Sequence, residues 1–297
     1  MTFKTSIVQI PISHINFKDT CFQITTNQEI SDLAQSINKI GLISTPLIYS
    51  KAYIEVNSYD KPNFKPNFKP NFNPGFTIIS GFRRIKACHK LGLKTIEVRT
   101  LDKNTEQIDL IRFAIAENAF QRPLNSIEKS RAYEMLSRRF SDDNKDIDEK
   151  TLEKEALSLG LSDSFHMIKK IRPLIHMPES IQKGILEDSI SPDIALELNS
   201  LKTEEKEMLA NLFIDLKLSK SKQREVFNLL KDISLCHEIS LNEILNEKGL
   251  NEILQDQEID RNLKSSKLRT ILKQRRYPAI VKAEQVYAKY VKELKLG

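Results

Sequence analysis

The first group of residues that could do chemistry is a basic motif, Ser80-Gly81-Phe82-Arg83-Arg84, which follows an apolar run and opens a predicted helix. A glycine at such a point lets a ligand come close to the backbone, and the free amides at a helix start favour an anion. Two adjacent arginines can clamp phosphate oxygens through charge-assisted hydrogen bonds. The motif predicts phosphate binding at Gly81, Arg83 and Arg84, with a tight turn before a surface arginine pair as the alternative.

A second polar group is formed by Glu117 and Asn118, near the end of a helix predicted to begin at about Glu106, and Arg122 follows it. A carboxylate beside an amide can hold a hydrated Mg²⁺ or orient a water near phosphates. Glu117 and Asn118 are therefore candidate metal ligands. The alternative interpretation is a polar helix end that binds nothing.

The third group is a predicted helix-turn-helix. A helix over residues 151–157 is followed by a turn at Gly160, which can take a positive φ, and by a second helix from Ser162 to about Ile175. A helix of this size fits the major groove of DNA, where its first side chains meet base edges. The residues expected to contact DNA are Ser162, Asp163, Ser164, His166, Met167, Lys169, Lys170 and Arg172. An ordinary helical hairpin is the alternative.

Residues 1–103 must position the first motif, and their pattern predicts a small mixed α/β domain. The expected strands are residues 6–10, 46–49, 76–79 and 95–99. The expected helices are residues 30–40 and 83–91. Within residues 51–76, the repeat KPNF recurs from residue 61 onwards. A proline at every fourth residue excludes both helix and sheet, so an extended, mobile loop is predicted there.

From about residue 104 the chain is predicted to be entirely helical, because helix start signals recur at regular intervals. Asn125 with Glu128, and Ser240 with Glu243, have the spacing of capping boxes, and Ser191 precedes a proline in the manner of an N-cap. We assign residues 104–200 to a helix-turn-helix domain and residues 201–297 to a helical carboxyl-terminal region. The fold class is therefore α+β.

Charge is distributed unevenly along the chain. Residues 261–297 contain eleven Lys or Arg and two Asp or Glu, whereas the first 260 residues carry a small negative charge. A basic tail suits nucleic acid, although a solvated helical face is an equal alternative. A helix predicted at about 279–296 carries an apolar stripe that could pack on its own chain or on a second copy.

Several classes of protein are disfavoured by composition. No run approaches the roughly 18 apolar residues of a membrane span, and the first residues do not resemble a secretory signal, which favours the cytoplasm. The cysteines Cys21, Cys88 and Cys236 lie far apart with no CxxC pair, which predicts reduced thiols. The five histidines show no metal-ligand spacing.

Taken in order, these motifs resemble those of the ParB/Spo partition family. The resemblance covers about residues 5–200 and includes a ParB/sulfiredoxin-like amino-terminal domain and a KorB-like helix-turn-helix. It is carried by the stretches DLAQSINKIGLISTPLI, SGFRRIKACHKLGLKTIEV, ENAFQRPLNSIEKSRAYEML and ALSLGLSDSFHMIKKIRPLIHMPESIQKGILEDSISPDIALEL.

The resemblance implies CTP and Mg²⁺ as ligands of the amino-terminal domain, which in that family closes a dimer into a clamp that slides on DNA. Carried over, it assigns phosphate contacts to Gly81, Arg83 and Arg84, and it includes Arg122 among the residues that bind the nucleotide. Glu117 and Asn118 would hold the metal and the triphosphate, and residues 162–172 would recognise a palindromic site. At most a weak CTP hydrolase is implied.

The chain departs from the family pattern at three positions. Phe82 stands where the family usually has glutamate, and Gln23 stands where we expect an arginine. Arg122 comes five residues after Glu117 instead of four, which on a helix adds about 100° of rotation.

The resemblance thus implies a cytoplasmic, nucleoid-associated partition protein of a chromosome or plasmid. Its implied partners are double-stranded DNA, a second copy of the chain and a ParA-type ATPase, with no membrane. One alternative is a helix-turn-helix transcription regulator whose nucleotide pocket has decayed. A nuclease is a further alternative, and it would need a cluster of metal-binding carboxylates around Glu117.

Overall fold

The computed structural model describes residues 5–49, 75–141, 149–161 and 163–294. The chain forms two compact units, Met1–Arg172 and Pro173–Gly297. The first unit therefore includes the helices up to residue 172, which the sequence analysis placed in a separate domain from residues 1–103. The division of the chain into three domains stays a prediction.

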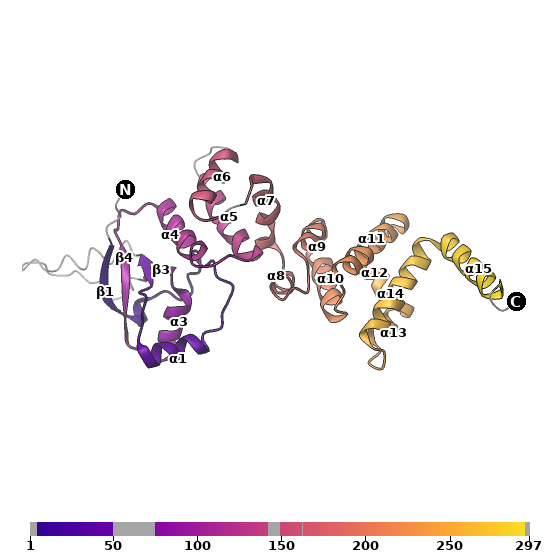
Figure 1. Ribbon diagram of the computed structural model, residues 1–297, viewed down its shortest axis with the longest axis horizontal. Helices are drawn as coiled ribbons and strands as arrows, with labels where there is room; N and C mark the ends of the chain where they lie inside the picture. The colour runs from indigo at the N-terminus through magenta and orange to yellow at the C-terminus, as the bar shows by residue number, and fades with distance from the viewer. Residues whose placement is uncertain (1–4, 50–74, 142–148, 162, 295–297) are drawn as a thin grey trace, which may run out of the picture. The chain divides into compact units, whose positions relative to one another are not determined.

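A four-stranded mixed sheet lies in the first unit (Figure 1). Its strands are β1 (Thr5–Pro11), β2 (Leu47–Tyr49), β3 (Thr77–Ser80) and β4 (Thr95–Leu101), in the order β1-β4-β2-β3. β1 pairs antiparallel with β4, β4 pairs parallel with β2, and β2 pairs antiparallel with β3. All four predicted strands are confirmed, and their ends differ from the predicted ones by one or two residues.

Two helices complete the α/β part of this unit, α1 (Ser31–Ile40) and α3 (Phe82–Lys90), and they pack against each other. The side chains that alternate inward along β4, Ile96 and Val98, are buried, and so is Ile85 of α3. The KPNF repeat falls between the paired strands β2 and β3. Its predicted extended, mobile state concerns residues that, apart from 75 and 76, lie outside the described ones.

The remaining helices of the first unit are α4 (Gln107–Ala119), α5 (Ser126–Ser141), α6 (Glu149–Ser158) and α7 (Phe165–Ile171). α5, α6 and α7 pack on one another (Figure 1). The capping box before α5 is confirmed, because Asn125 Oδ1 accepts from the Glu128 amide while a Glu128 carboxylate oxygen accepts from the Asn125 amide. α7 ends earlier than predicted, and a 3₁₀ turn follows from Arg172. Pro173 explains the early end, since it has no backbone N–H with which to continue the hydrogen bonds of the α-helix.

The second unit is all-helical in its described residues. Its helices are α8 (Glu179–Leu186), α9 (Pro192–Glu197), α10 (Thr203–Asp215), α11 (Lys220–His237), α12 (Leu241–Leu245), α13 (Lys248–Gln255), α14 (Arg261–Arg276) and α15 (Pro278–Leu294). The cap at Ser191 and the capping box at Ser240 are both formed as predicted. Within the described ranges, every helix is too short or too polar to span a bilayer. The α+β fold class is confirmed.

Candidate functional site

The turn from β3 into α3 requires a glycine. Gly81 has φ +87°, in the left-handed region that favours glycine, and a Cβ atom there would lie 2.8 Å from the Cβ of Pro46. α3 then begins at Phe82 without a side-chain cap, so no side chain satisfies the amides of its first turn. The turn therefore directs unsatisfied backbone donors at the point where the sequence predicts a phosphate.

Arg84 joins the first predicted motif to the second. Its Nη2 atom lies 3.0 Å from Oε1 of Glu117 in an ion pair between α3 and α4. Its Nη1 atom donates to the carbonyl and hydroxyl oxygens of Ser44, at 2.9 and 2.6 Å. The side chain is 18% exposed, so the pair is partly shielded from water. The fold thus brings together two motifs that lie 33 residues apart in the sequence.

Arg83 is placed differently from Arg84. Its Nε and Nη2 atoms donate to the backbone carbonyl of Glu29, at 3.0 and 2.7 Å. Within the part of the chain that the structure describes, no carboxylate forms an ion pair with Arg83. Arg83 therefore keeps a positive charge that an anionic ligand can neutralise.

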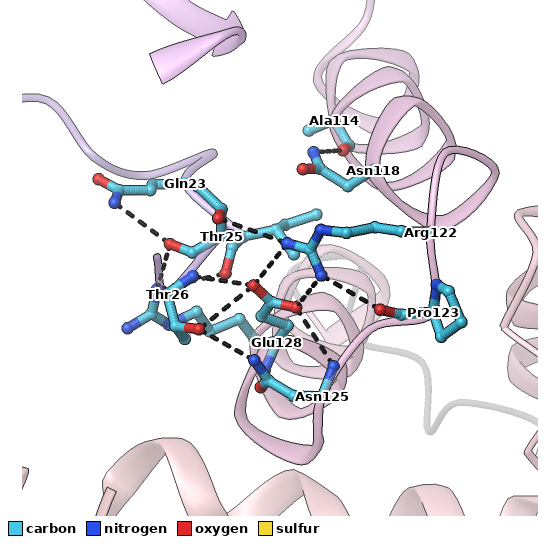
Figure 2. Close-up of polar contacts among 11 residues, drawn as sticks. Gln23, Thr25, Thr26, Ala114, Asn118, Arg122, Pro123, Asn125 and Glu128 are labelled. Carbon is cyan, nitrogen blue, oxygen red and sulfur yellow. Dashed lines mark hydrogen bonds and ion pairs between the residues drawn. The ribbon is translucent and has the colours of Figure 1, made fainter. Parts of the chain in front are cut away.

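Asn118 occupies the last turns of α4, and its Nδ2 atom donates to the carbonyl of Ala114 at 2.7 Å (Figure 2). This leaves its Oδ1 atom as an acceptor on the residue that follows Glu117. Mg²⁺ is commonly held by one or two carboxylates together with phosphates and waters. One carboxylate and one amide oxygen on neighbouring residues fit a share in such a coordination sphere.

Arg122 lies beyond the end of α4 and is committed to Glu128, at the start of α5 (Figure 2). Nη1 and Nη2 of Arg122 lie 2.7 and 2.8 Å from the two carboxylate oxygens of Glu128, which gives a bidentate pair. Because α4 ends at Ala119, the extra residue before Arg122 carries it past the helix instead of rotating it around the helix. The predicted phosphate ligand Arg122 is thus engaged within the protein.

The sequence identifies Glu128 only as half of a capping box, and it does not predict that this carboxylate is buried. It is 1% exposed. Burial acts to raise its pKa, but hydrogen bonds from Arg122 and from the amides of Thr26 and Asn125 outweigh burial and hold the pKa below its usual value. Glu128 is therefore a buried anion whose charge is compensated by named donors.

Asp163, a predicted DNA contact, is directed at α5. Its Oδ2 atom accepts from the hydroxyl of Tyr133 at 2.6 Å and lies 2.8 Å from Nζ of Lys129. Burial acts to raise the pKa of Asp163, yet the bonds from Lys129 and Tyr133 lower it overall. This carboxylate holds the start of α7 against α5, which leaves it little freedom to meet a base edge.

The other predicted DNA contacts differ in how they are placed. Arg172 follows the end of α7, where its Nε atom lies 3.2 Å from a carboxylate oxygen of Glu134 on α5. Ser162 lies outside the described residues. The exposed residues at the N-cap and along α7 are Ser164, His166, Met167, Lys169 and Lys170.

Comparison with known proteins gives the family of the amino-terminal part. Residues 2–119 match the ParB N-terminal domain family. This part of the chain is a ParB N-terminal domain. The match includes Gly81, Arg83, Arg84, Glu117 and Asn118, and it ends before Arg122.

The chain is also 29% identical over 202 residues to the nucleoid occlusion proteins of Bacillus thuringiensis (strain Al Hakam) and Bacillus cereus (strain B4264). These matches cover 67% of this chain and 58% of each relative, so the chain aligns with less than two thirds of their length.

Among solved structures, the C-terminally truncated chromosome-partitioning protein ParB from Caulobacter crescentus, complexed with CTP-γ-S, matches at 17% identity and a TM-score of 0.29. That match covers 70% of this chain and 99% of that one. A Pnob8-like ParB-N domain matches at 12% identity and a TM-score of 0.41, over 93% of this chain and 99% of that one.

Phe82 is 6% exposed, so its ring belongs to the core of the ParB N-terminal domain. The residue that departs from the family pattern thus packs inward at the first position of α3. Its burial stabilises the helix that carries Arg83 and Arg84.

A cavity of about 790 Å³ lies elsewhere in the ParB N-terminal domain, near the start of α4. Its lining includes Asp19, Cys21, Tyr49, Thr77 and Lys103, and none of the predicted phosphate residues lines it. Burial, together with the neighbouring Asp19, raises the pKa of Cys21 to about 12, so this thiol stays protonated at neutral pH. The three cysteines are free, as predicted.

Four of the seven cations of α14 form ion pairs within the second unit. Arg269 and Lys273 both pair with Glu225 of α11, at 2.6 and 2.9 Å. Arg276 lies 3.4 Å from Asp232, and Arg275 pairs with Glu247. Part of the positive charge of α14 therefore faces acidic side chains of its own unit.

Proposed function

We propose that this chain is a DNA-binding, ParB-like partition protein that binds CTP with Mg²⁺ in its amino-terminal domain. The observation that carries the proposal is the 3.0 Å contact between Arg84 and Glu117, which unites the phosphate motif with the metal motif. The match of residues 2–119 to the ParB N-terminal domain family supports it.

The pairing of Arg84 with Glu117 suits a ligand that carries both charges. A triphosphate with Mg²⁺ offers an anion to Arg84 and a cation to Glu117, so both side chains can exchange partners without leaving a half-buried charge uncompensated. Arg83 and the uncapped amides of α3 add positive potential for the phosphates. Glu117 and Asn118 would hold Mg²⁺, which when bound would neutralise part of the phosphate charge.

We further propose that the exposed face of α7 recognises double-stranded DNA, in a helix-turn-helix with α6. Gly160 has φ +83° in the turn between these helices, as the motif requires. Ser164, His166 and Met167 stand at the beginning of α7, where base edges are met, and Lys169 supplies charge for the phosphates. A palindromic site read by a homodimer, and a ParA-type ATPase as partner, belong to the same proposal.

The test of the nucleotide site is direct binding of labelled CTP to the purified full chain with Mg²⁺, with ATP, GTP and UTP as competitors. We expect selective CTP binding that Arg83→Ala/Arg84→Ala abolishes. Arg99→Ala, which removes an exposed arginine of β4, is the matched control and should bind as wild type does. A folded wild-type chain that binds no nucleotide would overturn this part and favour the transcription regulator.

The test of DNA recognition is selection of bound fragments from random DNA, followed by footprinting with and without CTP. We expect one palindromic sequence to be enriched, and we expect His166→Ala to change that preference. A footprint that does not depend on CTP would also favour the regulator. Enrichment of no sequence would overturn site-specific binding.

A further inference from the structure

A polar network joins two parts of the first unit that lie about a hundred residues apart in the sequence, and Glu128 lies at its centre (Figure 2). One carboxylate oxygen accepts from the amide of Thr26 at 2.9 Å and from its hydroxyl at 3.2 Å. The same carboxylate pairs with both terminal nitrogens of Arg122. A single buried group therefore binds the segment before α1 and the residue after α4.

The segment Gln23–Thr26 has no helix or strand of its own, so side-chain bonds must hold it. Arg131 of α5 donates to the carbonyl of Ile24 at 3.2 Å and to that of Thr25 at 3.1 Å. Asn125 donates to the hydroxyl of Thr26 at 2.9 Å. All these bonds come from the first turns of α5 and its cap, so the segment is anchored to that end of the helix.

The network borders the candidate nucleotide site. Figure 2 shows the guanidinium of Arg122 between the segment with Gln23 and Thr25 on one side and the end of α4 with Asn118 on the other. Arg122 also approaches the hydroxyl of Thr25, at 3.4 Å. A shift of Arg122 would therefore disturb the segment through its contact with Thr25.

We propose that Glu128 is a positioning residue of the nucleotide site, because it fixes the segment Gln23–Thr26 and Arg122 in one arrangement opposite Asn118. This inference rests on the proposed function. Glu128 acts through Arg122 and Thr26 and touches no ligand. Arg122 then serves as the link between α4 and α5, and the charge for the phosphates comes from Arg83 and Arg84.

The test compares Glu128→Gln with Glu155→Gln in the full chain. Both substitutions remove one carboxylate that pairs with an arginine in or just after α4, since Glu155 pairs with Arg112 at 2.6 Å. Among the described residues, however, Glu155 makes no polar contact with the segment Gln23–Thr26. Two quantities are measured in each variant: hydrogen exchange at the Thr26 amide and the Kd for CTP with Mg²⁺. Should Glu128→Gln fail to fold, Thr26→Ala and Glu128→Asp replace it.

For Glu128→Gln we expect Thr26 exchange to become at least about tenfold faster and CTP affinity to fall by about tenfold, as the loss of bonds to a charged group implies. Glu155→Gln should leave both unchanged. Unchanged exchange at Thr26, or faster exchange with an unchanged Kd, would overturn the positioning role. If wild type binds no nucleotide, the proposed function fails, and faster Thr26 exchange alone would then leave Glu128 a purely structural residue.

Discussion

At the scale of single residues, the candidate site depends on groups that are already satisfied within the protein. Arg84 forms an ion pair with Glu117, and Arg122 forms one with Glu128. A phosphate that binds either arginine must therefore compete with a carboxylate of the protein. The two pairs differ in burial, because Arg122 is 44% exposed but its partner Glu128 is almost fully enclosed, whereas Arg84 and Glu117 are each about a fifth exposed. If Arg122 turned to a ligand, it would leave the buried carboxylate of Glu128 without its ion pair, so we expect a ligand to compete for Arg84 more easily than for Arg122.

Gly81 offers a direct test of the turn before α3. Gly81→Ala should destabilise the chain, because the alanine must adopt φ +87° and its Cβ would overlap Pro46. The matched control is Gly92→Ala, at φ +72° with nothing within 4 Å of the added atom. We expect a loss of about 1–2 kcal/mol for Gly92→Ala and at least about 1 kcal/mol more for Gly81→Ala. Urea unfolding measures both, and equal losses would remove the clash with Pro46 from the explanation.

Glu128 predicts a pH dependence of stability. Its pKa in the folded chain lies below the ordinary value of 4.5, so its ionised form stabilises the fold above that value. This contribution is lost as the pH falls through the folded pKa. The free energy of unfolding of wild type should therefore exceed that of Glu128→Gln by a constant amount at neutral pH, and the difference should shrink below pH 4.5. A difference that grows towards acid would contradict the assignment.

At the scale of elements, α5 is the helix that organises the first unit. Its first turns hold the segment before α1, and its next turns hold both ends of α7, through Asp163 at the start and Arg172 after the end. Arg131 contacts the segment before α1, whereas Lys129 and Glu134 contact the residues at the two ends of α7. One helix therefore holds two neighbouring parts of the unit. The orientation of α7 is consequently set by α5.

Tyr133→Phe tests this attachment. The substitution keeps the buried ring but removes the hydroxyl that donates to Asp163 at 2.6 Å. Since a hydrogen bond to a charged group contributes about 1.5–3 kcal/mol, we expect the free energy of unfolding to fall by about that amount. DNA affinity should fall as well, because α7 loses one of its anchors. Lys169→Ala is the control: it should weaken DNA binding without changing thermal stability.

At the scale of the whole molecule, net charge alone is a poor guide to the DNA-binding surface. The sequence concentrates positive charge in the tail, yet four cations of α14 face carboxylates of α11 and of Glu247, just before α13. An arginine that already has an acidic partner releases fewer counterions from DNA than a free one. We therefore expect the tail to contribute less to the proposed DNA binding than its composition indicates.

Arg275→Ala/Arg276→Ala measures that contribution. The sequence predicts that this double variant flattens the salt dependence of DNA binding. The ion pairs with Glu247 and Asp232 lead to a different expectation, in which the slope is unchanged and the free energy of unfolding falls by about 1 kcal/mol or less for each pair. Binding titrations at several salt concentrations decide between the two. If the slope of log K against log salt concentration falls by about one for each arginine, the tail contacts DNA phosphates.

The sequence was sufficient to predict contacts between residues that lie close together in the chain. The capping boxes at Asn125 and Ser240 and the cap at Ser191 involve residues within one turn, so their spacing is sufficient. The partners of Arg122, Asp163 and α14 could not be predicted in the same way, because they depend on which elements the fold brings together. The motifs themselves were recognised, and the contact of Arg84 with Glu117 between them required the structure.

The way in which α7 is held also bears on how such a protein could diversify. The contacts that fasten it use Asp163, Arg172 and the buried side chains Ile168 and Ile171, and they leave Ser164, His166 and Met167 outside the packing. Substitutions at these three surface positions carry little penalty in stability. Under the proposed DNA recognition, descendants of one ancestor would thus acquire different target sequences by changing a few exposed side chains, while the scaffold beneath them is inherited unaltered.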